Sequence, residues 1–412
     1  MRSLSLNFPL FPPLSFLRRY SPYIPALLMD FCLSSILTNT SFYSSYLHLS
    51  STFLGTLIAI STAFFVILAV PFGRLSDRVG RARVLCTACL LLSGVSFILP
   101  FCRRKLHLVI AFPCVGISQA LFWPAYEAWL AEREGGGSLI TRLMIFNLFW
   151  SVGIMIGPVL SSYLYSGSNP IIPFYLAGVF SLCNWGVIYF QSKSHQGGQN
   201  SPVGTELTPV PTFDEPPLRK PSPELQHAYL RIARVANFAS WFSLGVLRQL
   251  APKLTLEMGV PTKLFGNLML TLGVLQTLVF LWLGTARSAR WHYQLLPLVC
   301  VQLLSALGFT AIWFVKRPIL WMPAFGVIGA CAAITYFSSI YYSLHGQSDK
   351  GNKSGWHEAI LGSGILLGPF LGGMLSDSAL GVKSPYLLCA GVIGVCIVVE
   401  GFIGRKTGRV DK

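Results

Sequence analysis

Charge is scarce in this sequence, and acidic charge is the scarcest. Only 11% of its 412 residues are charged, and Asp and Glu together number 15 against 31 Lys and Arg. A soluble domain carries about 25% charged residues, so this chain cannot cover itself with a water-compatible surface, whereas a lipid bilayer tolerates such a composition. The net charge of +16 would suggest nucleic acid in a soluble protein. In a membrane protein it reflects topology, and no nucleic-acid partner is expected.

Motifs of nucleotide-binding and hydrolytic enzymes are missing as well. The sequence has no Walker loop, no H-E-x-x-H and no G-x-S-x-G, and Gly135-Gly-Gly137 lacks the Lys-Ser/Thr that phosphate binding needs. The ten cysteines are scattered, and Cys86-x-x-Cys89 has no second pair, so packing explains it better than metal binding. We therefore expect no enzyme, no cofactor, no metal site and no ATP-driven transport by this chain alone.

What the sequence does contain is a series of apolar blocks long enough to span a bilayer, which takes about 20 residues of helix. The last of them has Glu400 as its only charge. The pattern predicts twelve spans, near residues 21–47, 52–73, 83–101, 107–131, 140–164, 170–190, 230–249, 264–284, 291–315, 319–342, 356–376 and 385–404.

The basic residues are distributed unevenly across these spans. If the amino terminus lies in the cytoplasm, most of the 31 Lys and Arg fall on the cytoplasmic side, as the positive-inside rule requires. The run Arg103-Arg104-Lys105 is the exception, and Arg248 falls near the outer end of the seventh span, where its side chain would reach the headgroups. We expect an integral protein of the plasma (inner) membrane with both termini cytoplasmic, and Met1–Tyr20 as a tail, not a cleaved signal.

A proline-rich polar segment divides the spans six and six, and the two halves look like copies. Gly153-Ile-Met-Ile-Gly157-Pro158 matches Gly364-Ile-Leu-Leu-Gly368-Pro369 at an offset of 211 residues, and the loops after the second and eighth spans begin at the same offset. Such duplication is a transporter architecture. The predicted division is a tail at 1–20, a bundle at 21–190, a cytoplasmic linker at 191–226, a second bundle at 227–404 and a tail at 405–412.

The strongest local motif follows the second span: Gly73-Arg-Leu-Ser-Asp77-Arg78-Val-Gly80-Arg81. The glycines permit a tight turn. Asp77 can pair with the arginines or face the N-terminus of a helix, whose partial positive charge attracts carboxylates. Such a cluster can hold two halves together in one conformation and release them in another.

This segment resembles the signature loop of the major facilitator superfamily, G-x-L-[AS]-D-R-x-G-R-[KR], with Ala82 where a second basic residue is usual. The resemblance covers the whole chain, through its twelve spans and central linker. It implies an all-α membrane fold of twelve helices in two pseudo-symmetric six-helix bundles. It also implies a gating role for Asp77, Arg78 and Arg81. The alternative is a basic loop that only sets topology, which would need neither Asp77 nor the glycines.

Small residues recur every fourth position in the fifth and eleventh spans, at Gly153 and Gly157 and at Gly364, Gly368 and Gly372. This spacing lets helices approach closely, and Pro158 and Pro369 can bend them. These rows of small residues resemble the fifth-span motif of the family, which is associated mostly with its exporters. Close packing of helices alone also explains them. Phe112 stands where many proton-coupled exporters carry an arginine, which counts against their standard mechanism.

Ionisable groups inside a membrane are costly and are therefore candidate sites. Asp30 lies in the first span, Glu127 in the fourth, and His357-Glu358 begins the eleventh, with Asn147 at the repeat-equivalent position of Glu358. The alternative for each is a structural role, either stabilising the end of a helix or lying among the lipid headgroups. Because adjacent residues do not share a helix face, at most one of His357 and Glu358 is expected to face a cavity.

Aromatic residues crowd the helices that line the cavity in the family: Trp123, Tyr126, Trp241 and Tyr336. Such faces bind sugars, amphipaths or organic cations, and they also form interfacial belts. Together the observations predict a secondary transporter, functional as a monomer in membrane lipid, that moves a small organic solute by alternating access. Coupling to H⁺ is left open. The alternatives are a transporter-like sensor or partner-binding protein without net flux, and a membrane enzyme acting on lipid-linked substrates.

Overall fold

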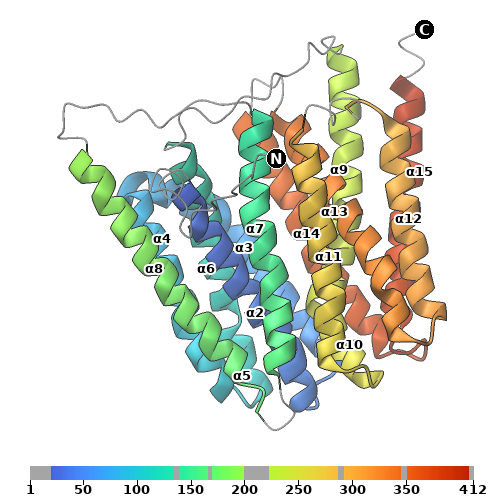
Figure 1. Cartoon of the computed structure of the whole chain (residues 1–412), viewed down its shortest axis with the longest axis horizontal. Helices are drawn as coiled ribbons and strands as arrows, with labels where there is room; N and C mark the ends of the chain where they lie inside the picture. Colours follow the sequence, from blue (N-terminus) through green and yellow to red (C-terminus); the bar gives the residue numbers. More distant parts are fainter. Residues whose placement is uncertain are drawn as a thin grey trace, which may run out of the picture.

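The computed structural model describes residues 20–132, 139–165, 169–198, 222–285, 292–344 and 350–407. These ranges are built of helices (Figure 1). The twelve long ones are α2 (Ile24–Tyr46), α3 (Ser51–Val79), α4 (Arg81–Ile98), α6 (Pro113–Ala131), α7 (Leu139–Leu164), α8 (Ile172–Gly198), α9 (Pro223–Gly245), α11 (Thr262–Leu283), α12 (Leu295–Phe314), α13 (Met322–Leu344), α14 (Lys350–Ser376) and α15 (Ser384–Thr407). The short pieces that extend them are η1 (Ser21–Tyr23), η2 (Leu99–Phe101), α5 (Lys105–Ala111), η3 (Val246–Leu250), α10 (Ala251–Glu257) and η5 (Pro318–Trp321).

Eleven of these helical stretches are long and apolar enough to cross a membrane. The twelfth span is α9, which lies beside the other eleven and is extended along the chain by η3 and α10. Large apolar side chains such as Ile67, Phe190 and Leu296 are exposed on the outside of the bundle, where only lipid can cover them. The predicted all-α membrane protein with twelve helices in two six-helix bundles is therefore confirmed.

The helices form two halves, α2–α8 and α9–α15 (Figure 1). In the first half α2 packs on α7 and α8, and α6 packs on α3 and α4. In the second half α9 packs on α13, α14 and α15, and α12 packs on α13 and α15. The halves meet mainly through two helix pairs, α3 with α14 and α7 with α11. In chain order α3 corresponds to α11 and α14 to α7, so the two contacts are equivalent under the internal duplication.

The bundle has two ends, because successive long helices run in opposite directions. We call the end where α2 begins and α15 ends the terminal end, which lies at the top of Figure 1. The far end carries the turns from α2 to α3 and from α14 to α15.

Glycines set the distances between the central helices. A Cβ at Gly153 would overlap the carbonyl oxygen of Leu27 on α2, and one at Gly368 would overlap the carbonyl oxygen of Phe242 on α9. A Cβ at Gly157 or at Gly364 would overlap atoms of the same two helices, whereas a Cβ at Gly372 would come within 3.3 Å of the side chains of Leu250 and Val246 in η3. Each row of small residues thus joins the fifth or eleventh span to the first helix of its own half.

Two predicted boundaries differ from the structure. Helix α8 runs to Gly198 and α9 begins at Pro223, so helices reach into both ends of the predicted linker at 191–226. Residues 199–221, 1–19 and 408–412 lie outside the described residues. The seventh span, predicted to end near 249, passes through the π turn η3 and continues in α10 to Glu257.

Candidate functional site

A cavity of about 1130 Å³ lies between the two halves. Helices α2, α3, α6 and α7 line it from the first half, and α9, η3, α13 and α14 line it from the second. Of the residues predicted from sequence, six contribute to its wall along with Pro158: Asp30, Trp123, Glu127, Trp241, Tyr336 and Glu358.

The deeper part of the cavity holds two opposite charges. Asp30 comes from α2 and Arg248 from η3, and each is less than one-tenth exposed. They attract each other electrostatically, yet no ion pair of 4 Å or less joins them. Arg248 instead donates from Nη2 to Oε1 of Gln276 at 2.7 Å, and its guanidinium lies 5.7 Å from the ring centre of Trp241.

The expected position of Arg248 in the headgroups is therefore wrong. The prediction failed because it ended the seventh span near this residue. Since η3 and α10 carry the helix onward, Arg248 lies inside the protein and lines the cavity. Gln249, the next residue, lines it too. The sequence signal that could have placed Arg248 in the cavity is that the seventh span is long, polar and interrupted by charged residues.

Two carboxylates from opposite halves line the cavity toward the terminal end. Glu127 projects from α6 and is exposed, and the side chain of Glu358 on α14 is 34% exposed. The two lie close enough to interact electrostatically. Within the described ranges neither forms an ion pair with Lys or Arg, and the only partner of Glu358 is His357, at 3.9 Å from Nε2 to Oε1.

His357 and Asn147 do not line the cavity. The imidazole of His357 is fully buried, and its Nδ1 lies 2.8 Å from Oγ of Ser339 on α13. Asn147 is also fully buried, and its Oδ1 accepts a hydrogen bond from Nε1 of Trp150 at 2.9 Å. Of the adjacent pair His357 and Glu358, only the glutamate therefore faces the cavity.

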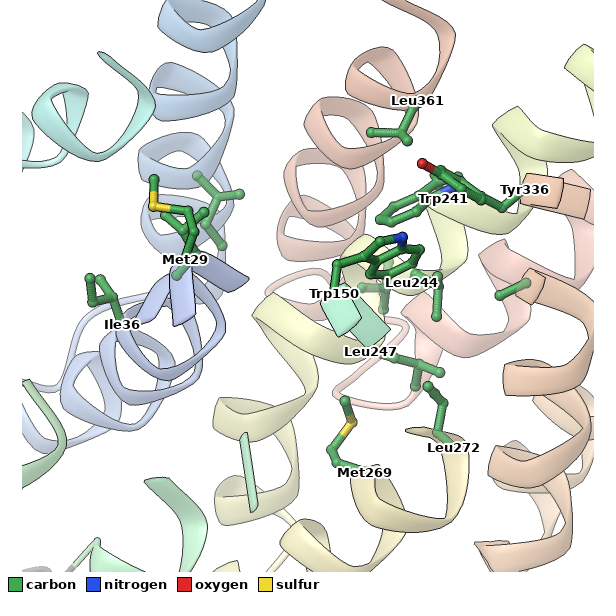
Figure 2. Packing of buried hydrophobic residues seen from close by; sticks show 14 of the residues in the cluster. Met29, Ile36, Trp150, Trp241, Leu244, Leu247, Met269, Leu272, Tyr336 and Leu361 are labelled. Atoms are coloured by element: carbon green, nitrogen blue, oxygen red, sulfur yellow. The ribbon is translucent and has the colours of Figure 1, made fainter. Parts of the chain in front are cut away.

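Aromatic rings from both halves meet at the cavity wall. Trp150 of α7 lies 5.3 Å from Tyr336 of α13 and 6.3 Å from Trp241 of α9, measured between ring centres. Figure 2 shows these three side chains close to one another, with Met29 at a distance from them. The sequence reasoning missed Trp150, although Asn147 three residues earlier marked the same helix face.

Tyr126, predicted to line the cavity, does not. Its ring is buried between Phe122 and Phe146, and its hydroxyl donates to the carbonyl oxygen of Pro22 at 2.9 Å. Trp123 on the same helix does line the cavity, and its ring centre lies 6.2 Å from that of Tyr126, so Tyr126 packs behind it.

At the far end the two halves are joined by Asp377, which follows α14. Its carboxylate accepts hydrogen bonds from the backbone N–H groups of Ser51 and Thr52 at 3.1 and 2.7 Å, and from Oγ1 of Thr52 at 2.7 Å. These amides begin α3 and have no partner within the helix, so an acid of one half caps a helix of the other. Beside this cap, a Cβ at Gly373 would overlap the carbonyl oxygen of Ser51.

This cap predicts a dependence of stability on pH. Burial raises the pKa of Asp377, but the hydrogen bonds from Thr52 and Ser51 outweigh it and hold the pKa below its usual value. A carboxyl whose pKa is lowered by folding stabilises the folded state at pH values above its pKa in the unfolded chain, about 4. That stabilisation is lost as the pH falls through the pKa of the folded state. Asparagine keeps one accepting oxygen and loses the charge, so we expect Asp377→Asn to cost about 1 kcal/mol near neutral pH, the net value of a lost hydrogen bond, and nothing in strong acid.

The measurement is thermal unfolding of the purified protein along a pH series. Glu224→Gln, at an exposed acid in the first turn of α9, is the matched control: it removes a solvent-screened attraction to a helix N-terminus without any hydrogen bond between the halves, so its pH-dependent difference from wild type should be smaller than that of Asp377→Asn. A constant difference between Asp377→Asn and wild type at every pH would contradict the cap.

The signature motif lies at the terminal end and is arranged differently. Asp77 at the end of α3 pairs with Arg81 at 3.0 Å, and Arg81 donates from Nε to Oε1 of Glu132 at 2.6 Å. All three residues belong to the first half, and the Asp77 side chain is 59% exposed. Gly80 makes the turn from α3 to α4 with a φ of 98°, a conformation that L side chains rarely adopt.

Comparisons with known proteins agree with this architecture. A family model described as Major Facilitator Superfamily matches residues 23–348. The uncharacterized MFS-type transporter Rv0849 of Mycobacterium tuberculosis is 33% identical over 110 residues, which is 27% of this chain and 26% of that protein. The uncharacterized MFS-type transporter YhjO of Bacillus subtilis is 28% identical over 170 residues, 40% of each chain. These alignments thus span less than half of either relative.

A solved structure, the nucleoside transporter NupG, superposes with a TM-score of 0.67 and covers 93% of this chain and 98% of its own. Its sequence identity of 13% makes this a likeness of fold alone. With the matched segment spanning most of the two bundles and the signature motif in its place, this chain belongs to the Major Facilitator Superfamily.

Proposed function

We propose that this protein is a secondary transporter that moves a small organic solute with a positively charged group by alternating access. In this proposal the terminal end faces the cytoplasm of the cell, the chain lies in the plasma (inner) membrane, and one copy suffices. The observation that carries the proposal is the cavity between the halves, which both halves line with charged and aromatic side chains.

The contacts between the halves support a state open toward the terminal end. At the far end α3 and α14 touch through backbone, since a Cβ at Gly55 would overlap the carbonyl oxygen of Pro369, and Asp377 caps α3 beside this contact. Among the charged lining residues, Arg248 is buried deep in the cavity, whereas Glu127 near the terminal end is exposed. Solvent and solute would enter there and meet a closed far end.

The charges of the cavity favour a cationic solute. Among the described residues, three carboxylates, those of Asp30, Glu127 and Glu358, line it against one guanidinium, that of Arg248. Aromatic faces beside carboxylates attract organic cations through their ring quadrupoles. Protons would compete for Glu127 and Glu358, because two like charges in one site favour protonation of one of them. Exchange of solute for H⁺ at these two groups would couple the flux to a proton gradient.

Reconstitution of the purified chain in liposomes tests this function. We expect uptake of an aromatic quaternary ammonium such as benzyltrimethylammonium, faster with an outward-directed gradient of protons or of the unlabelled cation across the membrane than without one. Phenylacetate, an anion of similar size, should not be taken up. Uptake of uridine in preference to the cation would contradict the charge argument, and binding without any flux would favour a sensor.

The signature motif gives a further prediction for the opposite state. We propose that Asp77, Arg78 and Arg81 hold the terminal end closed when the far end opens. Asp77→Ala should slow flux about ten-fold if the contact stabilises that state by about 1.4 kcal/mol, with normal membrane insertion. Because the gate would stabilise the state in which the far end opens, Asp77→Ala should also slow hydrogen exchange at Ser51 and Thr52, even though Asp77 pairs with Arg81 of its own half in this structure. Wild-type flux in correctly inserted Asp77→Ala would contradict the gate.

A further inference from the structure

A second buried acid lies outside the central cavity, inside the carboxy-terminal half. Glu400 projects from α15 and Gln302 from α12, two helices that pack against each other. Glu400 is fully buried and Gln302 almost fully, and neither lines the cavity described above. An acid at this depth in a membrane-spanning helix is costly unless its charge is paired or removed.

The hydrogen bonds around this pair leave one donor missing. Nε2 of Gln302 donates to Oε2 of Glu400 at 2.7 Å and to the carbonyl oxygen of Leu298 at 3.4 Å, so both amide hydrogens have acceptors. Oε1 of Glu400 and Oε1 of Gln302 are buried and have no partner in the described part of the chain. Two acceptors without a donor are unfavourable, and one added hydrogen would satisfy both.

No basic side chain that the structure describes takes the place of that hydrogen. Helices α9, α12 and α14 and the turn η3 pack against α15, and α12 carries no charged residue. Glu400 forms no ion pair with any Lys, Arg or His that the structure describes. The thiols of Cys331 on α13 and Cys396 on α15 lie within its electrostatic reach, and a thiol carries no compensating positive charge.

We propose that Glu400 is a proton-binding site: the carboxyl holds a proton on Oε1 and donates it to Oε1 of Gln302, closing a cyclic acid–amide pair between α12 and α15. The ligand is H⁺, and its site is separate from Glu127 and Glu358. Loss of the proton would place a carboxylate against a carbonyl oxygen in an apolar interior. The proton thus holds α12 to α15, and the carboxy-terminal half loosens as the pH rises.

Infrared spectroscopy of the full-length protein in detergent tests the proton directly. The difference spectrum of wild type minus Glu400→Gln at neutral pH should contain the carbonyl stretch of a protonated carboxyl, shifted to lower frequency in D₂O. Carboxylate bands in place of that carbonyl band would overturn the proposal. Gln302→Leu keeps the acid and removes its acceptor, so the carbonyl band should move to higher frequency. An unmoved band in a folded Gln302→Leu protein would also contradict the pair.

Thermal unfolding gives a second readout that does not depend on transport. Glutamine at 400 offers the same donor and acceptor as a protonated acid, so Glu400→Gln should unfold with wild type at about pH 4, where the acid is protonated in both the folded and the unfolded chain. At higher pH only the folded state keeps the proton, so wild type should lose stability as the pH rises and Glu400→Gln should unfold increasingly above it. Glu224→Gln, at an exposed acid, should follow wild type throughout. Parallel profiles for wild type and Glu400→Gln from about pH 4 to about pH 9 would mean that the folded state binds no additional proton at Glu400 and would sink the proposal.

Discussion

Gly55→Ala is expected to prevent the far end from closing and to reduce flux about ten-fold or more, since overpacking a close contact costs about 1–3 kcal/mol. The new Cβ would overlap the carbonyl oxygen of Pro369 and come within 3.0 Å of Cα of Phe370. Both are backbone atoms, so no rotamer change can relieve the clash. Helices α3 and α14 belong to different halves, and the halves can relieve it by moving apart.

Two readouts separate this effect from misfolding. Flux is measured in liposomes, and hydrogen exchange is measured at Ser51 and Thr52, whose amides Asp377 caps in this structure and which opening of the far end is expected to expose. Gly94→Ala is the matched control, because a Cβ at Gly94 on α4 meets nothing within 4 Å. Unchanged flux and exchange in Gly55→Ala would show that the halves need not approach at this point.

The helices were predictable because a bilayer leaves little choice. Lipid requires each span to satisfy its own backbone hydrogen bonds and to be apolar for about 20 residues, and eleven of the spans meet that requirement plainly. The difficult one was α9 with η3 and α10, whose buried polar residues Asn237, Arg248 and Lys253 make it resemble a shorter span. Its residues serve the protein interior instead of facing lipid, and composition alone does not distinguish the two.

The site was predictable where a single residue carried its own signal. Asp30, Glu127 and Glu358 stood out because a charge in an apolar span is energetically costly unless it has a function, and all three line the cavity.

Asp377 gave no such signal, since it follows a span and resembles any loop acid. Its partners Ser51 and Thr52 lie more than 300 residues away in the chain, and no local pattern announces a contact that only the meeting of two halves creates. Asn147 and Tyr126 failed for the opposite reason, because polar or aromatic character does not say which face of a helix meets the cavity.

Glu358→Gln and Glu127→Gln are expected to weaken binding of an organic cation by about ten-fold each, the loss that follows from about 1.4 kcal/mol of attraction to one carboxylate. Glutamine keeps the size of the side chain and removes its charge. Because each glutamate lacks a Lys or Arg partner in the described ranges, its charge is available to a solute or a proton. The two come from α6 and α14, so a cation held between them would draw the halves together at the terminal end, as occlusion requires.

The same pair should set the pH dependence of binding. In wild type, lowering the pH adds protons that displace the cation, so affinity should fall toward acid; in the double variant the pH profile should be flat. Quenching of the cavity tryptophans Trp150 and Trp241 by the bound cation reports affinity, and Glu224→Gln is the control for a change of charge outside the cavity. If the double variant kept both the affinity and the pH profile of wild type, the cation would have to sit instead at Asp30, where Arg248 already attracts the carboxylate.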